Sequence, residues 1–294
     1  MSGHSPVFGS QNKILLRAEN LTIRFGGLVA VQDFSLAVPA QDIVGLIGPN
    51  GAGKTTVFNL ITGVYMPNQG QVFLEERELT GRGAHHISRA GVARTFQNIR
   101  LFSGLTVLEN VVAALCWQRR GTSLASLLSW PQTKSAEKKL FEQAIACLEF
   151  VGLSTYADWE ATALPYGLQR KLEIARALST QPQVILLDEP AAGMNPTEKD
   201  ELAVLVRDIV SKFSIGVLLI EHDMKFVMNL CSKITVLDHG EVIAVGRPAE
   251  IRSNPKVIEA YLGADDTSMA QADVQRSETA ASPAGSGGAG GQPS

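Results

Sequence analysis

Cysteine is scarce in this sequence of 294 residues, and its three cysteines follow no metal-ligand spacing. Cys116, Cys147 and Cys231 are odd in number and scattered, so we interpret them as reduced thiols and not as a disulfide framework or a zinc site. Long apolar runs are also missing. No stretch approaches the roughly 18 consecutive apolar residues of a membrane-spanning helix, and the N-terminal residues lack a signal-peptide pattern, so we expect a chain that does not itself cross a membrane.

The body of the chain lacks an excess of charge of either sign. The whole sequence has 26 basic and 29 acidic residues, for a net charge of −3. The C-terminal tail, residues 264–294, accounts for this difference with four acids and one base: Asp265, Asp266, Asp273, Glu278 and Arg276. Because proteins that bind nucleic acid duplexes usually carry a strong excess of Lys and Arg, this balance argues against a nucleic acid partner.

The same tail contains no Leu, Ile, Phe, Tyr or Trp, but many Ala, Gly and Ser. Such a segment cannot bury enough apolar surface to offset the conformational entropy that ordering costs. We therefore predict that residues 264–294 are disordered.

The periodicity of the remaining chain predicts an α/β fold. Apolar residues alternate over 21–25, as in a half-buried strand, and residues 43–47 form an almost unbroken apolar run that leads into a glycine-rich loop and a helix. Two further apolar runs, 184–187 and 215–220, end in charged residues, as parallel strands do where their carboxyl ends line a ligand crevice.

The middle of the chain has a different period. Residues 107–115 and 140–148 carry apolar side chains at helical spacing, with no convincing strand between them. We interpret residues 98–165 as a helical subdomain that is inserted into the α/β domain. Farther along, Asn195 and Pro196 are the residue types that begin a helix, and residues 238–240 have the composition of a hairpin turn.

A phosphate-binding loop is the most specific motif in the sequence. The pattern G-x-x-x-x-G-K-[ST] lies between the predicted strand at 43–47 and the following helix, which is the context that this motif requires. Backbone N–H groups of such a loop converge on phosphate oxygens, Lys54 reaches the β and γ phosphates, and Thr55 binds Mg²⁺. The predicted nucleotide-binding residues here are Gly48, Pro49, Asn50, Gly51, Ala52, Gly53, Lys54, Thr55 and Thr56.

Two carboxylates follow the strand at 184–187. Asp188 and Glu189 suit a nucleoside triphosphate with Mg²⁺, because one acid can hold the metal shell while the other polarises an attacking water. An ordinary charged strand end is the alternative interpretation.

At this point the sequence resembles the ATP-binding subunits of ABC transporters, over residues 12–263. The motifs of that family occur in its order: the phosphate loop, the Q-loop at 94–97, a signature region at 164–170, the acidic strand end at 186–190, the D-loop at 192–195 and a switch histidine at 220–223. The resemblance implies a P-loop NTPase (RecA-like) core, an inserted helical subdomain and a small antiparallel β subdomain. Residues 1–11 are then an N-terminal extension.

Segments 24–28, 94–102, 189–196 and 254–263 look most like the subunits of branched-chain amino acid importers of LivG type. This resemblance implies that ATP is hydrolysed to power uptake through transmembrane permease subunits, on the cytoplasmic face of the inner membrane. It implies a second ATP-binding subunit, in a heterodimer or a homodimer, and a periplasmic solute-binding protein as an indirect partner.

The resemblance also assigns roles to single residues. Phe25 stacks on adenine, Gln97 senses the metal and the attacking water, Glu189 is the base, and His222 contacts the γ phosphate. Other interpretations remain open for three of these residues. Phe25 could be a core-facing strand residue, Gln97 a surface polar residue, and His222 a structural histidine or a metal ligand.

The signature region departs from the family pattern. Pro165 stands where the family has Ser, and Leu168 stands where it has Gln. In the family the Ser contacts the γ phosphate held by the opposite subunit, and Pro165 has neither a hydroxyl nor an N–H to offer. Gly167 can still offer its N–H. We hypothesise a heterodimer with one dominant site, in which the loop of this chain meets an intact partner signature.

Three other functions stay open: the ATPase of an importer of urea, amides or another solute, a soluble ABC ATPase of repair or translation, and a regulatory nucleotide-binding module. The single phosphate loop and the short interval between Lys54 and Asp188, which has no room for a long coiled coil, oppose the second of these.

Overall fold

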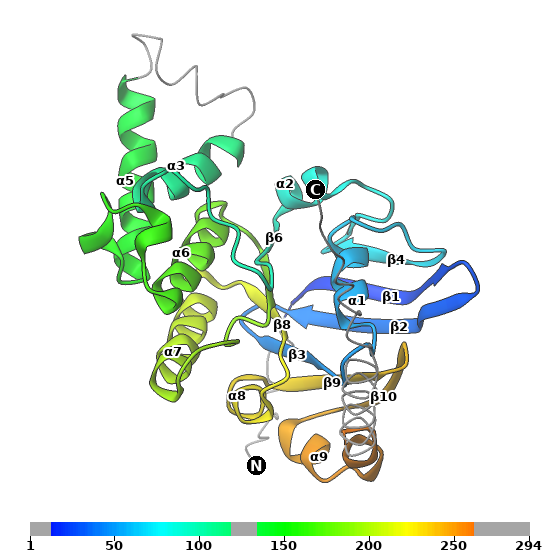
Figure 1. Cartoon of the computed structure of the whole chain (residues 1–294). Helices are drawn as coiled ribbons and strands as arrows, with labels where there is room; N and C mark the ends of the chain where they lie inside the picture. The colour runs from blue at the N-terminus through cyan, green and yellow to red at the C-terminus, as the bar shows by residue number, and fades with distance from the viewer. Residues whose placement is uncertain (1–12, 119–133, 262–294) are drawn as a thin grey trace, which may run out of the picture.

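A computed structural model describes residues 13–118 and 134–261, and these residues form two sheets with helices around them (Figure 1). The extension at 1–11 and the tail at 264–294 lie outside the described residues, so the predictions made for them stay predictions.

The larger sheet has six strands in the order β10-β9-β3-β8-β7-β6. Its strands are β3 (Ile43–Ile47), β6 (Val92–Arg94), β7 (Val184–Asp188), β8 (Gly216–Ile220), β9 (Lys233–Asp238) and β10 (Glu241–Gly246). β10 pairs antiparallel with β9, and the other pairings are parallel. The carboxyl ends of β3, β8, β7 and β6 therefore meet at one edge of the sheet, as the charged strand ends predicted.

The smaller sheet is antiparallel, with strand order β2-β1-β4-β5. It comprises β1 (Ile14–Phe25), β2 (Leu28–Pro39), β4 (Gln69–Leu74) and β5 (Arg77–Glu78). Gly26 and Gly27 join β1 to β2, and Phe25 pairs with Leu28 across this turn. A buried cluster that includes Phe34 of β2, Leu46 of β3 and Phe58 of α1 (Lys54–Ile61) joins this sheet to the larger one.

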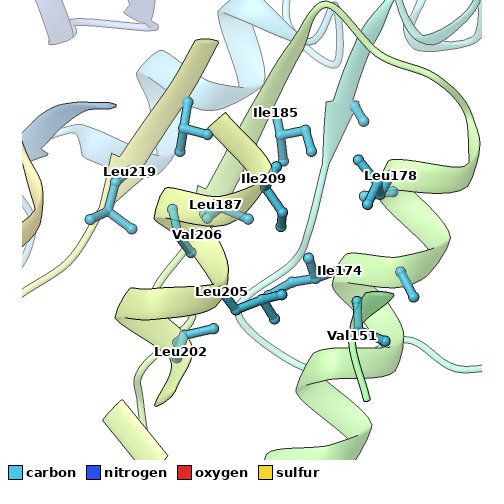
Figure 2. Close-up of a cluster of buried hydrophobic side chains, with 14 of the residues drawn as sticks. Val151, Ile174, Leu178, Ile185, Leu187, Leu202, Leu205, Val206, Ile209 and Leu219 are labelled. Atoms are coloured by element: carbon cyan, nitrogen blue, oxygen red, sulfur yellow. The ribbon is translucent and has the colours of Figure 1, made fainter. Parts of the chain in front are cut away.

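The opposite face of the larger sheet is covered by helices. In β7, Val184 and Leu186 point to the cluster around α1, whereas Ile185 and Leu187 point to the cluster with α6 (Tyr166–Ser179) and α7 (Pro196–Phe213). Figure 2 shows Ile185 and Leu187 against the α7 side chains. Side chains along β7 thus alternate between the two faces of the sheet, and both sets are buried, as expected for a strand that is covered on both faces. Asn195 caps α7 and forms a capping box with Glu198, as predicted.

Helices α3 (Val107–Gln118) and α5 (Lys134–Phe150) contact each other and α6, and they form the helical part at one end of the molecule (Figure 1). The described residues of the interval 98–165 otherwise form two short 3₁₀ helices, Ser154–Tyr156 and Ala161–Ala163, and one isolated bridge. Further helices are α2 (Ala84–Ala90), α8 (Met224–Leu230) and α9 (Pro248–Arg252), and residues 255–261 are also helical.

The predicted fold class, an α/β core with a helical insertion and an antiparallel sheet, is confirmed, whereas the domain bounds stay a prediction. Among the described residues, no helix is both long and apolar enough to cross a membrane.

Candidate nucleotide-binding site

The glycine-rich loop connects β3 to α1, and two of its glycines leave no room for a side chain. A Cβ on Gly48 would lie 2.0 Å from the carbonyl oxygen of Leu237, and a Cβ on Gly53 would lie 2.7 Å from that of Ala30. Gly53 also has a φ of +103°, which other residues rarely adopt. The backbone can therefore form a close cradle ahead of the N-terminus of α1, where N–H groups and the helix dipole favour an anion.

Lys54 is buried inside this loop. Its Nζ donates hydrogen bonds to the carbonyl oxygens of Gly48, at 2.7 Å, and Pro49, at 2.8 Å. Burial lowers the pKa of Lys54, and the nearby carboxylates of Glu189 and Asp188 act in the opposite direction. The amine and both acids thus share one electrostatic environment, while Thr55 at the start of α1 is exposed.

Asp188 ends β7 and is buried against Arg94, which ends β6. Arg94 Nη2 donates to Asp188 Oδ2 at 2.9 Å, and Arg94 Nη1 donates to Asn59 Oδ1 of α1 at 2.7 Å. The rings of Phe58 and Phe96 lie 5.4 and 5.2 Å from the Arg94 guanidinium carbon. Arg94 thereby joins the phosphate-loop helix, the acidic strand end and the segment that follows β6.

Glu189 is held in an unusual backbone conformation. Its φ is +47°, in the left-handed region that non-glycine residues seldom occupy, and its N–H donates to the carbonyl oxygen of Ile220 in β8 at 2.9 Å. Such conformations cost on the order of 1 to 3 kcal/mol and gather at functional sites. Here the bend turns the carboxylate out of the line of the strand.

Gln97 and His222 both approach this carboxylate. Gln97 Nε2 donates to Glu189 Oε2 at 2.9 Å, and His222 Nδ1 lies 3.6 Å from the same oxygen. The three residues follow β6, β7 and β8, which are neighbours in the sheet. Two of the predicted catalytic side chains, Gln97 and His222, therefore converge on one oxygen of the third, Glu189. They do so because parallel strands bring their carboxyl ends to one edge of the sheet.

A buried carboxylate supports the two loops of this group. Glu221 has no exposed surface, and its Oε1 accepts a hydrogen bond from the Ala191 N–H at 2.7 Å. Burial raises the pKa of the Glu221 carboxyl, against the opposing effects of this N–H and of His222. Glu221 fixes the loop after Glu189 to the segment that carries His222.

Phe25 lies at the end of β1 with 46% of its surface exposed, so the alternative interpretation of Phe25 as a core residue is wrong. Only the inner part of the alternating strand is buried, and Phe25 reaches beyond it. Its ring packs edge to face on Tyr65, with centroids 5.2 Å apart. An exposed aromatic pair beside a phosphate loop offers a stacking surface for a planar base.

The signature segment contacts the Q-loop, since Arg170 Nη2 donates to the Gln97 carbonyl oxygen at 2.8 Å. Gly167 is buried in the first turn of α6, where a Cβ would lie 2.8 Å from Glu198 Oε1. In Figure 1, α6 belongs to the helical part of the molecule, together with α3 and α5.

The donor set suits Mg²⁺ bound together with phosphates. Within residues 13–118 and 134–261, no group of three or more His, Cys, Asp or Glu side chains could hold a metal ion by itself. Mg²⁺ at a phosphate site takes few protein ligands, since phosphate oxygens and waters complete its octahedron. One hydroxyl, on Thr55, and one carboxylate, on Asp188, match that requirement.

Three residues of this site escaped the sequence reasoning: Arg94, Tyr65 and Glu221. Their roles depend on contacts between distant segments, and no spacing in the sequence announces them. Arg94 is the first residue of the Q-loop and Glu221 precedes the switch histidine, but these positions alone do not predict the contacts that the two side chains make.

Comparison with known proteins gives two family matches. A family described as "ABC transporter" matches residues 31–192, and one described as "Branched-chain amino acid ATP-binding cassette transporter" matches residues 241–267.

Curated relatives match nearly the whole described chain. The high-affinity branched-chain amino acid transport ATP-binding protein BraF of Pseudomonas aeruginosa is 47% identical over 249 residues, which cover 85% of this chain and 98% of BraF. LivG of Salmonella typhimurium is 48% identical with the same coverage. The lipopolysaccharide export system ATP-binding protein LptB of Acidithiobacillus ferridurans is 34% identical, over 85% of this chain and 97% of LptB.

Solved structures match as well. The ADP conformation of an ATP-binding cassette of an ABC transporter has a TM-score of 0.74 and 34% identity, over 85% of this chain and 99% of that chain. A nucleotide-free ATP-binding cassette has a TM-score of 0.73 and 34% identity, over 84% of this chain and 98% of that chain.

Proposed function

The chain belongs to the ABC transporter family of ATP-binding proteins, and on this premise we propose that it is the ATP-hydrolysing subunit of an importer of branched-chain amino acids. The transported solute is taken from the printed functions of BraF and LivG, which match this chain over 98% of their own length. The site geometry supports the ATPase part of the proposal independently.

One observation carries that part. Gln97 and His222 both reach the Glu189 carboxylate, in an electrostatic environment that Glu189 and Asp188 share with Lys54. A base, two polar groups that can orient a water, and a lysine for the phosphates are the components that phosphoryl transfer to water needs.

The chain's own residues divide the reaction among them. The loop N–H groups and Lys54 hold the phosphates. Lys54 Nζ has three N–H donors, of which the Gly48 and Pro49 carbonyls take two, so at least one is available to a phosphate oxygen. Thr55 and Asp188 would hold Mg²⁺, which when bound neutralises charge between the β and γ phosphates. Glu189 accepts the proton of the water that attacks the γ phosphorus, the bond to the ADP oxygen breaks, and ADP and phosphate leave.

We propose that a second ATP-binding subunit completes the site, as membership of the ABC transporter family implies. With Pro165 and Leu168 in the signature segment, a heterodimer would hydrolyse ATP chiefly at the loop of this chain. The substitution Glu189→Gln in this subunit of a reconstituted heterodimer should then remove most of the ATPase activity. Retention of most of the activity would assign the dominant site to the other subunit.

A cavity of about 560 Å³ beside the Q-loop is the contact surface we propose for the permease. Phe96, Phe102 and Trp117 line it together with Arg100 and Arg176. Its mixture of aromatic and basic side chains suits a short helix of a membrane protein, and Gln97 directly follows one wall. We propose that the subunit lies on the cytoplasmic face of the inner membrane, and that the periplasmic solute-binding protein acts on it only through the permease.

The test is reconstitution of the full chain with two permeases, a second ATPase subunit and a solute-binding protein in proteoliposomes. We expect slow ATP hydrolysis by the chain alone, stimulation several-fold on assembly, and ATP-dependent uptake of labelled leucine. Uptake of urea or an amide in place of leucine would overturn the solute, and absence of stimulation by the permeases would overturn the importer.

A further inference from the structure

Arg170 is the largest fully buried side chain described, and it contacts the Q-loop backbone. From the first turns of α6, its Nη1 donates to the Phe96 carbonyl oxygen at 2.7 Å and its Nη2 donates to the Gln97 carbonyl oxygen at 2.8 Å. These two carbonyls belong to the peptide units on either side of the Gln97 Cα. One planar guanidinium thus restrains both dihedral angles of Gln97.

Glu173, one turn farther along α6, completes the contact. Its Oε1 accepts a hydrogen bond from the Phe96 N–H at 3.0 Å, and its Oε2 accepts one from Arg170 Nη1 at 2.6 Å. Both backbone groups of Phe96 are therefore bound to side chains of α6. The two charges thus pair with each other and with backbone groups, and only Arg170 Nε is buried without a hydrogen-bond partner.

A third side chain on the same face continues this pattern. Arg176 Nη1 donates to the Arg100 carbonyl oxygen, and the Arg176 guanidinium lies 4.5 Å from the centre of the Phe102 ring. Positions 170, 173 and 176 are three apart, so they lie along one face of the helix. The segment from Phe96 to Phe102 is therefore bound along its length to α6, the helix that carries most of the signature segment.

The other end of the Q-loop is attached to the core of the protein. Arg94 is bound to Asp188 and Asn59, and the Thr95 N–H donates to the Leu186 carbonyl oxygen at 3.0 Å. Gln97 therefore lies at a junction: its backbone is bound to α6 of the helical part, and its side chain is bound to Glu189 of the core.

We propose that Arg170 and Glu173 are positioning residues that fix the backbone conformation of Gln97. Through them, any displacement of α6 is transferred to the contact between Gln97 and Glu189. This inference rests on the proposed function, since it gives Gln97 a part in ATP hydrolysis. In this proposal neither Arg170 nor Glu173 touches the nucleotide, so the affinity for ATP should not depend on these two residues.

The first variant is Arg170→Lys, which keeps the charge beside Glu173 but loses the fork that binds two carbonyls. We expect kcat of the reconstituted complex to fall at least about tenfold, because a displacement on the order of 1 Å can cost about a hundredfold in rate. The Kd for a fluorescent ATP analogue should stay within about twofold. Lys171→Met, the adjacent position whose partner Glu201 is exposed, is the matched control and should leave both values unchanged.

A second variant, Arg170→Met with Glu173→Gln, removes both charges together and guards against loss of folding from one unpaired buried charge. The decisive measurement combines each variant with Gln97→Ala. If Arg170 acts through Gln97, the combined kcat equals that of Gln97→Ala alone, while the shifts in Tm still add.

Full additivity of the kcat losses would overturn the inference, as would a wild-type kcat in Gln97→Ala. Both results leave a wild-type complex that hydrolyses ATP and imports leucine. Failure of the proposed function would give a different result, since the wild-type complex would then not hydrolyse ATP or would not respond to the permeases.

Discussion

Gln97 and Glu189 are 92 positions apart in the chain, yet the Gln97 side-chain amide donates a hydrogen bond of 2.9 Å to the Glu189 carboxylate. The bond forms because β6 and β7 are adjacent parallel strands, and each residue follows the carboxyl end of its strand. An ionised carboxylate has about four acceptor sites, so Glu189 can keep this bond and still accept a proton from a water.

The substitution Glu189→Gln should separate binding from hydrolysis. It removes the base but leaves Lys54 and the loop in place, so we expect hydrolysis to fall by about a hundredfold or more, with the ATP Kd within about threefold of wild type. Single-turnover hydrolysis and equilibrium binding measure the two quantities. Glu201→Gln, on the exposed side of α7, serves as the control, and equal losses in both variants would contradict the assignment of Glu189.

The exposed ring of Phe25 should contribute to base binding and not to phosphate binding. Stacking on a base contributes about 1 to 3 kcal/mol, so Phe25→Ala should weaken ATP binding by about tenfold, whereas Phe25→Trp should restore it. Competition by tripolyphosphate, which has no base, should be unaffected. Leu28→Ala, in the same hairpin and 68% exposed, is the matched control. An unchanged ATP Kd in Phe25→Ala would reject the stacking role.

Arg94 and Asp188 form a buried ion pair, with side chains 8% and 5% exposed. Removing one partner leaves an uncompensated charge, so Arg94→Met should lower the free energy of unfolding by about 3 to 5 kcal/mol. Adding Asp188→Asn should cost less than the sum of the single changes, because the two residues share one interaction. Urea unfolding measures all three variants, with Arg89→Met on the exposed side of α2 as control. Strict additivity would mean that the pair contributes no coupling.

Glu221 should make stability depend on pH. Burial raises its folded pKa above the ordinary 4.5, so the native state binds the proton more tightly than the unfolded state. The resulting stability is complete below about pH 4.5 and is lost as the pH rises through the folded pKa. A tenfold difference in proton affinity between the two states corresponds to about 1.4 kcal/mol. The stability of Glu221→Gln relative to wild type should therefore increase between pH 4.5 and 8 in urea unfolding.

Glu201 provides a control of opposite sign. Its hydrogen bond from Lys171 lowers the Glu201 pKa, so its contribution is present above pH 4.5 and is lost on acidification. The stability of Glu201→Gln relative to wild type should decrease as the pH rises. The same trend in both variants would contradict the assigned directions.

The sequence predicted local features well where one segment contains the whole signal. The loop from Gly48 to Thr55, the cap at Asn195 and the hairpin turn before Glu241 depend on residues within a few positions of each other, and each lies in the structure where the pattern placed it. The apolar periodicity sufficed to predict an α/β fold with a helical insertion, and the resemblance that the ordered motifs carry implied the antiparallel subdomain.

Tertiary structure decided what no local pattern encodes. The sequence patterns alone predicted that Asp188 follows a buried strand, and the sequence places Gln97 shortly after Arg94. They could not specify that Arg94 pairs with Asp188, or that Arg170 binds the peptides around Gln97, because strand order and helix packing set those distances. A contact between segments about 70 to 90 positions apart exists only after the chain has paid the entropy of bringing them together, and the packed core alone supplies that free energy.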